Sequence, residues 1–283
     1  MFDANINDVV ALPSNLLCDV SLMQSSIPPT LEGATSSGVL WQAAPNRFLF
    51  NVPNVARYLV EDGRRILIDP LPDVDNAAVI YFLRMSPLAA LLYQKGLVAL
   101  HAAIAVNDGG AVLLAGNSGA GKSTTLAALS QRNWVVFADD IAMVTHHKGK
   151  PVVYQMSPHG MLWPRSLEKL NIDAKSLPFA DNNRQIFSIS QHSSPVPRQL
   201  RTIYYLSVHN KDDISIAEIS GTLRFKVLSE CLYNSHIADV LLDRGEFMRF
   251  AASTQSVVIK RLQRPSRIWS AEMLADLIEK DVS

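Results

Sequence analysis

Residues 116–123 constrain this chain more than any other stretch, because they fit the spacing G-x-x-x-x-G-K-[ST] of a phosphate-binding loop. Glycines let a backbone turn sharply, so that successive N–H groups point at one anion. The lysine and the hydroxyl that close the motif suit phosphate oxygens and Mg²⁺. The residues predicted to contact a nucleotide are Gly116, Asn117, Ser118, Gly119, Ala120, Gly121, Lys122, Ser123 and Thr124.

The segments on both sides supply the context that such a loop needs. Ala111–Ala115 is a short apolar run and is predicted to be a buried strand that ends at Gly116. Thr124–Gln131 includes the apolar residues Leu126, Ala127 and Leu129 and no helix breaker, so a helix is expected there, with its positive end at the loop. The sequence therefore predicts a strand, a phosphate-binding loop and a helix in that order.

A second apolar strand, Trp134–Ala138, ends in the acidic pair Asp139 and Asp140. An acid at the carboxyl end of a strand after the loop helix is typical of a Mg²⁺-binding carboxylate. Because neighbouring side chains on a strand face opposite ways, the strand must break after Ala138 if both acids serve one site, and their roles should differ. ATP with Mg²⁺ is the predicted cofactor, and Ser123 and Asp139 are the predicted metal ligands.

Composition narrows the remaining classes of protein. The 283 residues suffice for one large or two modest domains, and 48% are hydrophobic, enough to bury a core. The 26 basic side chains balance 26 acidic ones, so no global positive field favours nucleic acid or an anionic membrane. No signal peptide is recognised at the start, and Cys18 and Cys231 lack disulfide or metal spacing, so a cytoplasmic protein with reduced thiols is expected. The longest apolar region, 88–106, is interrupted at 94–96, so no membrane span is expected.

The predicted fold class is α/β with α+β character: a phosphate-loop core with a mixed sheet at 97–283, preceded by a small β-rich segment with a helix at 1–96. The turn 107–110 predicts that a hairpin, and not a helical crossover, feeds the strand before the loop. Strands are predicted at 48–52, 57–60, 65–68, 97–106, 111–115, 134–138, 141–144, 151–156, 201–208, 214–219 and 257–262. Helices are predicted from Asp75 or Asn76 through Met85, and at 87–96, 124–131, 165–170, 225–232, 238–250 and 271–278.

Histidines occur at two places of interest. His146 and His147 lie in a predicted hairpin turn without a third metal-ligand partner in sequence, so a solvated tip is the favoured interpretation. His101 lies on the strand 97–106, where a hydrogen-bonded core histidine and a functional group are both open interpretations.

Three segments make the chain resemble the HPr kinase/phosphorylase group and its wider set of HPr-kinase-like proteins. The histidine-bearing strand 100–106 resembles that family's own, the loop with its inner Ser-Gly is similar, and so is the paired-aspartate strand end 136–140. Later pieces at 162–168, 183–184 and 264–265 resemble the kinase-like subgroup. The segment before residue 100 and the region 157–187 depart from the HPr kinase pattern.

The resemblance implies a fold related to phosphoenolpyruvate carboxykinase and transfer of a phosphoryl group from ATP to a serine hydroxyl. By matched position, Asp140 is expected to take the hydroxyl proton, Asp139 to hold Mg²⁺ and His101 to support the acidic pair. Lys122 completes the expected catalytic set. The subgroup is associated with peptide-modification clusters, so the expected acceptor is a peptide or protein, such as a precursor peptide. Arg184 is either a phosphate contact or a surface arginine.

Two other functions stay open at this point. The chain could bind ATP as a regulatory or assembly module without a phosphoacceptor, because a phosphate-binding loop does not name a reaction. It could also be a reversible kinase/phosphorylase, which phosphate-driven dephosphorylation would reveal. Neither a nucleic-acid partner nor a membrane partner is expected, and a homo-oligomer is left open.

Overall fold

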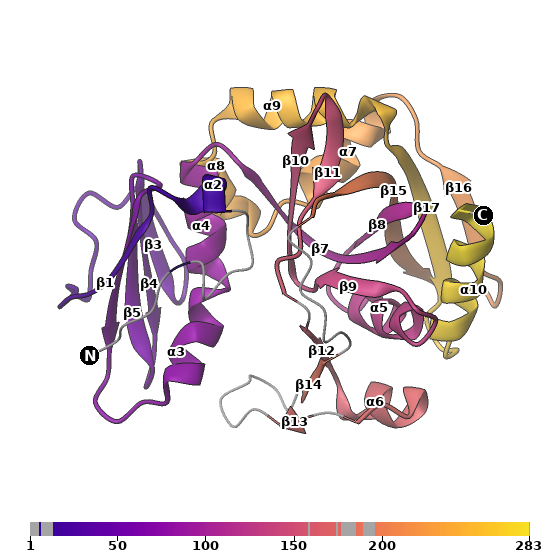
Figure 1. Cartoon of the computed structure of the whole chain (residues 1–283), viewed down its shortest axis with the longest axis horizontal. Helices are drawn as coiled ribbons and strands as arrows, with labels where there is room; N and C mark the ends of the chain where they lie inside the picture. Colours follow the sequence, from indigo (N-terminus) through magenta and orange to yellow (C-terminus); the bar gives the residue numbers. More distant parts are fainter. Residues whose placement is uncertain are drawn as a thin grey trace. The chain divides into compact units, whose positions relative to one another are not determined.

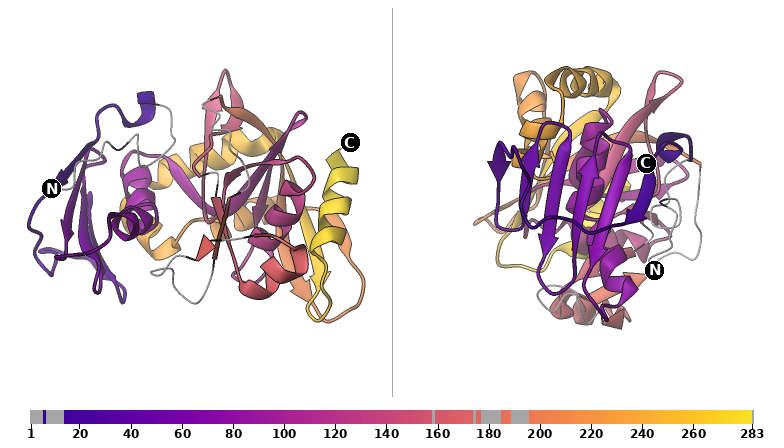
Figure 2. Two further views of the ribbon diagram at one scale, coloured as in Figure 1. Left: turned by 60° about the horizontal axis from the view of Figure 1, so that its bottom comes forward. Right: turned by 90° about the vertical axis from the view of Figure 1, so that its left-hand side faces the viewer.

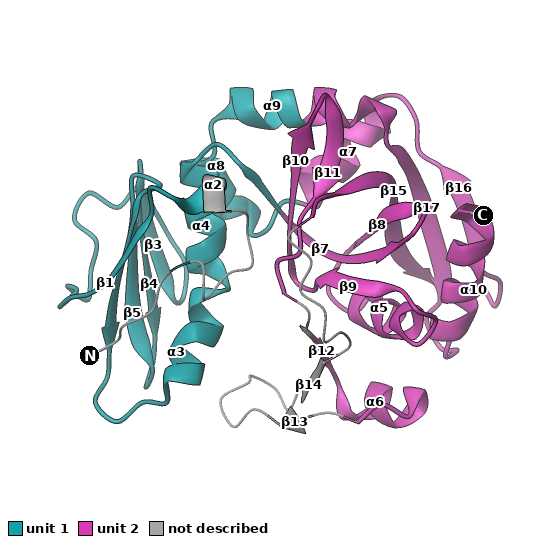
Figure 3. Ribbon diagram, viewed as in Figure 1, with its two compact units in different colours: residues 1–99, 232–250 teal, residues 100–231, 251–283 magenta. Residues whose placement is uncertain are grey.

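The computed structural model describes residue 6 and residues 14–157, 159–173, 175–176, 185–188 and 196–282. It divides into two compact units, one of residues 1–99 with 232–250 and one of residues 100–231 with 251–283 (Figure 3). Residues 232–250 thus belong to the first unit, although they fall within the predicted core domain 97–283. Arg184 lies outside the described residues.

The first unit contains a six-stranded mixed sheet with the order β1-β6-β5-β4-β3-β2. Its strands are β1 (Ser21–Gln24), β2 (Ser36–Ser37), β3 (Trp41–Ala44), β4 (Arg47–Val52), β5 (Ala56–Glu61) and β6 (Arg65–Pro70). The strands predicted at 48–52, 57–60 and 65–68 are confirmed as β4 to β6. The sequence did not reveal β1 to β3, because strands of two to four residues are too short for an alternating pattern to show.

Helices cover one face of this sheet (Figures 1 and 2). They include α3 (Asn76–Leu83), α4 (Ser86–Gln94) and α8 (Ser235–Leu241), and the short α2 (Ser14–Leu17) precedes β1. The predicted cap of α3 is confirmed, because the Asp75 carboxylate accepts a hydrogen bond of 2.9 Å from the N–H of Ala77. Residues 86–93 of α4 are all buried, and α4 packs on β4 and β5.

The single helix expected at 238–250 is wrong, because the structure has α8 followed by α9 (Arg244–Ser253). Leu242 adopts an extended conformation, and the Asp243 side chain accepts hydrogen bonds from the N–H groups of Gly245 and Glu246. An aspartate that binds backbone N–H groups ahead of it starts a new helix instead of continuing the old one.

Among the described residues, no individual helix has the length and apolarity needed to cross a membrane. The bent pair α3 and α4 meets that requirement only jointly, and only by length and composition.

The second unit contains an eight-stranded mixed sheet with the order β11-β10-β7-β8-β15-β17-β16, and β9 pairs with β7. Its strands are β7 (Val98–Asn107), β8 (Gly110–Ala115), β9 (Val135–Ala138), β10 (Ile141–His147), β11 (Lys150–Val153), β15 (Arg198–His209), β16 (Ser215–Glu218) and β17 (Val258–Pro265). The predicted hairpin is confirmed, since β7 and β8 are antiparallel neighbours. Among the pairings described for this sheet, two are parallel: β15 with β8, and β17 with β15. The coarse prediction of a mixed α/β chain is therefore confirmed.

Helices α5 (Lys122–Ser130) and α10 (Ala271–Val282) pack against each other and share a core with β8 and β15 (Figure 1). The carboxylate of Asp281 connects α10 to the sheet. It accepts a hydrogen bond of 2.6 Å from the hydroxyl of Tyr204 on β15 and pairs with the ammonium of Lys260 on β17. This unit also contains α6 (Pro164–Leu170), α7 (Thr222–Glu230) and the 3-10 turn η2 (Thr254–Ser256). A small sheet joins β12 (His159–Leu162), β14 (Gln185–Ser188) and β13 (Lys175–Ser176).

We expect Tyr93→Phe to destabilise the protein. The buried Tyr93 hydroxyl lies 2.7 Å from the carbonyl oxygen of Tyr233 and 2.9 Å from that of Ala99, and the variant leaves both carbonyls without this donor. The expected loss is about 1–3 kcal/mol in the free energy of unfolding, measured with urea. Tyr154→Phe is the control, because that hydroxyl has no partner in the described structure, and it should change stability by less than about 0.5 kcal/mol. Equal effects of the two variants would contradict the assignment.

Candidate functional site

The candidate site lies where parallel strands end. The carboxyl ends of β8, β15 and β17 meet at one edge of the sheet, and the loop 116–121 leaves β8 there and leads into α5. Ligands of open α/β sheets bind at such an edge. The elements predicted around the glycine-rich motif are thus confirmed, with α5 beginning at Lys122.

Two glycines are needed for the shape of this loop. A Cβ on Gly116 would lie 2.3 Å from the carbonyl oxygen of Leu206, and its φ of +134° is rarely adopted by other residues. Gly121 has a φ of +107° and stands at the N-cap of α5, where no side chain caps the helix. The first N–H groups of α5 have no intrahelical acceptor and no side-chain cap, so they are suited to bind an external anion.

Lys122 is a buried cation at the start of α5, with 7% of its surface exposed. Its ammonium donates a hydrogen bond of 2.7 Å to the carbonyl oxygen of Gly116 and a longer one of 3.4 Å to that of Asn117. The Nε2 atom of His101 lies 3.0 Å from the same ammonium. The Lys122 side chain therefore folds back along the inside of the loop.

His101 links this cation to the acidic pair. Since an ammonium only donates hydrogen bonds, Nε2 of His101 accepts from Lys122 and the proton of a neutral imidazole resides on Nδ1. Nδ1 faces Asp140, where it donates a hydrogen bond of 3.3 Å to the backbone carbonyl oxygen and lies 3.1 Å from Oδ1 of the carboxylate. The sequence left open whether His101 is a hydrogen-bonded core residue or a functional group. In the structure its side chain contacts both Lys122 and Asp140, and its backbone N–H donates to the carbonyl oxygen of Cys231.

The strand before the acidic pair does end at Ala138, as convergence of both acids on one site requires. Oδ1 of Asp139 accepts a hydrogen bond of 2.9 Å from the Ser123 hydroxyl, and Oδ2 accepts one of 2.9 Å from the backbone N–H of Met161. Asp140 has a φ of +82°, and its side chain is 45% exposed. The break lets the two carboxylates differ: both oxygens of Asp139 accept hydrogen bonds from the protein, while the Asp140 side chain is nearly half exposed.

Burial raises the pKa of Asp139 to about 6. The negative charge of Asp140 adds to this rise, while the hydrogen bonds from Met161 and Ser123 and the charge of Lys122 oppose it. A cation that binds beside such a desolvated carboxylate stabilises its charged form. The Ser123 hydroxyl and the Asp139 carboxylate are oxygen ligands of the kind that Mg²⁺ prefers.

Sequence reasoning assigned no role at this site to two groups, the backbone N–H of Met161 and the side chain of Arg264. The Arg264 guanidinium donates hydrogen bonds to the carbonyl oxygens of Gly119 and Ala120 from the end of β17. The resemblance at 264–265 marks this arginine but gives it no role. Its reach to the loop depends on the parallel order of β8, β15 and β17, which the sequence does not specify. His146 and His147 are exposed on the β10–β11 hairpin, and no cluster of three metal-binding side chains occurs among the described residues.

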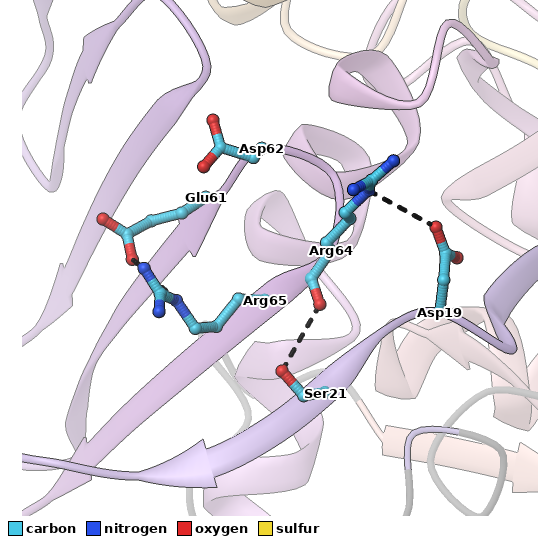
Figure 4. A pocket seen from close by; sticks show the side chains of 6 residues that line it. All are labelled: Asp19, Ser21, Glu61, Asp62, Arg64 and Arg65. Carbon is cyan, nitrogen blue, oxygen red and sulfur yellow. Dashed lines mark hydrogen bonds and ion pairs between the residues drawn. The ribbon is translucent and has the colours of Figure 1, made fainter.

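A hollow on the first unit is a weaker candidate (Figure 4). Its lining residues are Asp19, Ser21, Glu61, Asp62, Arg64 and Arg65. Arg64 pairs with Asp19 at 3.7 Å and Arg65 with Glu61 at 2.7 Å, so both cations are neutralised (Figure 4). A polyanion such as a nucleotide phosphate is not favoured there.

Comparison with known proteins gives limited matches. Residues 68–164, about a third of the chain, match the family model described as SynChlorMet cassette protein ScmC. A solved structure of the Hpr(Ser) kinase/phosphatase from Coxiella burnetii aligns with 65% of this chain and 95% of its own, at 11% identity and a TM-score of 0.33. No curated protein matches.

Gly116→Ala is expected to destabilise the protein more than Gly119→Ala. Both glycines have positive φ, so both substitutions carry backbone strain of about 1–3 kcal/mol. Only the Cβ at residue 116 meets a backbone oxygen at 2.3 Å, whereas nothing lies within 4 Å of a Cβ at residue 119. Urea unfolding of both variants measures the difference, and equal losses would contradict the close approach to Leu206.

The Asp139 carboxyl should make stability fall as pH rises between about 4 and 6. In that window the folded state keeps a proton that the unfolded state, with the ordinary pKa of 3.8, has lost, so the free energy of unfolding has a negative slope with pH. The penalty is about 1.4 kcal/mol per pKa unit and is complete above pH 6.

Asp139→Asn should therefore be more stable than the original chain at pH 7, and this gain should shrink toward pH 4. Urea unfolding in a chelating buffer at pH 4.5, 5.5 and 7 measures it. The exposed Asp212→Asn is the control and should leave the pH slope unchanged. An unchanged slope in Asp139→Asn would refute the assignment.

Proposed function

We propose that this protein is an ATP- and Mg²⁺-dependent kinase that transfers a phosphoryl group to the hydroxyl of a serine in a peptide or protein. One observation carries the proposal: Lys122, Ser123 and both acids converge on the loop at the carboxyl edge of the sheet. The Lys122–His101 hydrogen bond and the His101–Asp140 contact connect the lysine to one acid, and the Ser123–Asp139 hydrogen bond connects the hydroxyl to the other.

The groups present fit a magnesium nucleotide. The uncapped N–H groups at the start of α5 and the ammonium of Lys122 would hold phosphate oxygens. Ser123 Oγ and Asp139 Oδ1 are 2.9 Å apart and would both bind Mg²⁺. The residues proposed to hold the nucleotide are those of the loop and the start of α5, from Gly116 to Thr124.

Bound ATP with Mg²⁺ supplies the phosphoryl group to be transferred. The Asp140 carboxylate is the group through which this chain takes the proton of the attacking hydroxyl, because it is exposed to solvent and Asp139 is not free for this task. Nδ1 of His101 contacts both the backbone carbonyl oxygen of Asp140, at 3.3 Å, and its Oδ1, at 3.1 Å, and so positions this residue. A positive φ at a residue other than glycine is sparsely populated, and such strain is found at functional sites.

We propose a peptide as the acceptor. The match of residues 68–164 to a cassette protein family supports an acceptor encoded in the same cassette, and a precursor peptide is the acceptor that the resemblance to HPr-kinase-like proteins implies. The balanced net charge of the chain gives no support to a nucleic acid as the acceptor.

Asp140→Asn should leave ATP binding within about threefold and lower phosphoryl transfer by about 10²–10⁴-fold, the usual contribution of a positioned base. Calorimetric titration with ATP and Mg²⁺ measures binding. Radiolabelled ATP with serine-containing peptides, followed by mass spectrometry, measures transfer. Binding that weakens as much as transfer would contradict the base role of Asp140.

The same assay separates the kinase from the alternatives. Slow ATP hydrolysis with no phosphorylated product, together with ATP-dependent partner binding or a change of oligomer, would indicate a regulatory or assembly module. Removal of phosphate from the product when inorganic phosphate is added would indicate a reversible kinase/phosphorylase.

A further inference from the structure

We infer that Arg264 is a positioning residue that shapes the phosphate loop, an inference that rests on the proposed nucleotide function of that loop. Arg264 lies at the carboxyl end of β17, the strand two positions from β8 in the sheet. Its side chain crosses to the outer turn of the loop, 144 residues earlier in the chain.

The guanidinium is engaged by three carbonyl oxygens. Nε donates to Ala120 at 2.8 Å, one terminal nitrogen donates to Gly119 at 2.9 Å, and the other donates to Pro265 at 3.0 Å. The first two are neighbouring backbone carbonyls of the loop, so the planar fork of the arginine matches two consecutive peptide groups. Because both are charge-assisted, these hydrogen bonds are stronger than neutral ones.

The charge of Arg264 has no acidic partner within ion-pair distance in the part of the chain that the structure describes. Partial burial lowers the pKa of its guanidinium, as expected of a cation without a counter-ion. A half-buried arginine of this kind costs free energy that its carbonyl contacts only partly offset. A polyanion bound in the adjacent loop would supply the missing negative charge.

Peptide geometry explains how these contacts shape the loop. In a planar trans peptide the C=O and the following N–H point in opposite directions, and no described peptide bond is cis. When Arg264 holds the Ala120 carbonyl, the Gly121 N–H points away from the guanidinium. The contact with the Gly119 carbonyl likewise fixes the Ala120 N–H, which donates to the carbonyl oxygen of Asn117 at 3.0 Å and closes the turn.

Gly121 makes this arrangement possible. A Cβ at that position would lie 3.2 Å from Nε of Arg264, so any larger residue would press on the guanidinium. Gly121, the second glycine of the motif, therefore has two functions. It permits a positive φ, and it leaves room for the side chain of Arg264, which comes from a distant part of the sequence.

The test uses the full chain with Arg264→Ala, Arg264→Lys and the control Arg267→Ala. Arg267 is exposed and lies three residues from Arg264 in the sequence. The variant Arg267→Ala therefore removes the same charge without removing a contact to the loop. The readout is the affinity for ATP with Mg²⁺ by calorimetric titration. Arg264→Ala should weaken it by about 10- to 100-fold and Arg267→Ala by less than about twofold.

Arg264→Lys distinguishes loop shaping from simple charge. A lysine keeps the charge but lacks the fork that serves two carbonyls, so its affinity should also fall, by about fivefold or more. Affinity equal to that of the original chain in Arg264→Lys would overturn the assignment and indicate that the charge alone acts on the phosphates. Unchanged affinity in Arg264→Ala would overturn it as well.

Amide hydrogen exchange without nucleotide separates this inference from the proposed function. The amide of Ala120 should exchange about tenfold faster or more in both Arg264 variants and at the original rate in Arg267→Ala, because the turn opens when its carbonyls are released. Unchanged exchange would overturn the inference even if the protein binds ATP. Failure of the original chain to bind ATP with Mg²⁺ would refute the proposed function, while exchange still decides whether Arg264 shapes the loop.

Discussion

The buried ammonium of Lys122 is the constraint on which the rest of this site depends. A cation that is 7% exposed costs several kcal/mol unless hydrogen-bond acceptors surround it. The loop supplies two carbonyl oxygens, and β7 supplies His101. The need to satisfy one charge thus determines the path of the loop, the tautomer of the histidine and, through that histidine, the position of Asp140.

The acidic pair shows how one break in a strand separates two equivalent side chains. Asp139 turns inward, where both of its oxygens accept hydrogen bonds and burial raises its pKa to about 6. Asp140 turns toward His101 and remains open to solvent, at the cost of an unfavourable φ. Adjacent carboxylates with different surroundings can hold a metal and accept a proton without competing for the same task.

The sheet explains why groups from distant parts of the second unit meet. Three strands that run in the same direction, β8, β15 and β17, present their carboxyl ends together, and the glycine-rich loop and Arg264 both lie at those ends. The hairpin of β7 and β8 adds His101 from an antiparallel neighbour. In this mixed sheet, parallel strands supply the loop and Arg264, and an antiparallel strand supplies His101. An all-parallel sheet has no antiparallel neighbour to supply such a residue.

The amino-acid sequence by itself determined the local elements of this protein. The strand before the loop, the helix after it, the hairpin 107–110 and the acidic strand end all follow from apolar patterns, glycines and neighbouring residues. It failed at 238–250, where the side chain of Asp243 starts a new helix that hydrophobic spacing does not reveal. Only the tertiary structure decided that His101 contacts both Lys122 and Asp140, that the Met161 N–H holds Asp139, and that Arg264 reaches Gly119 across 145 residues. The physical reason is that these bonds depend on strand order and strand direction, which come from the packing of the whole unit and leave no periodic signal in the segments that they join.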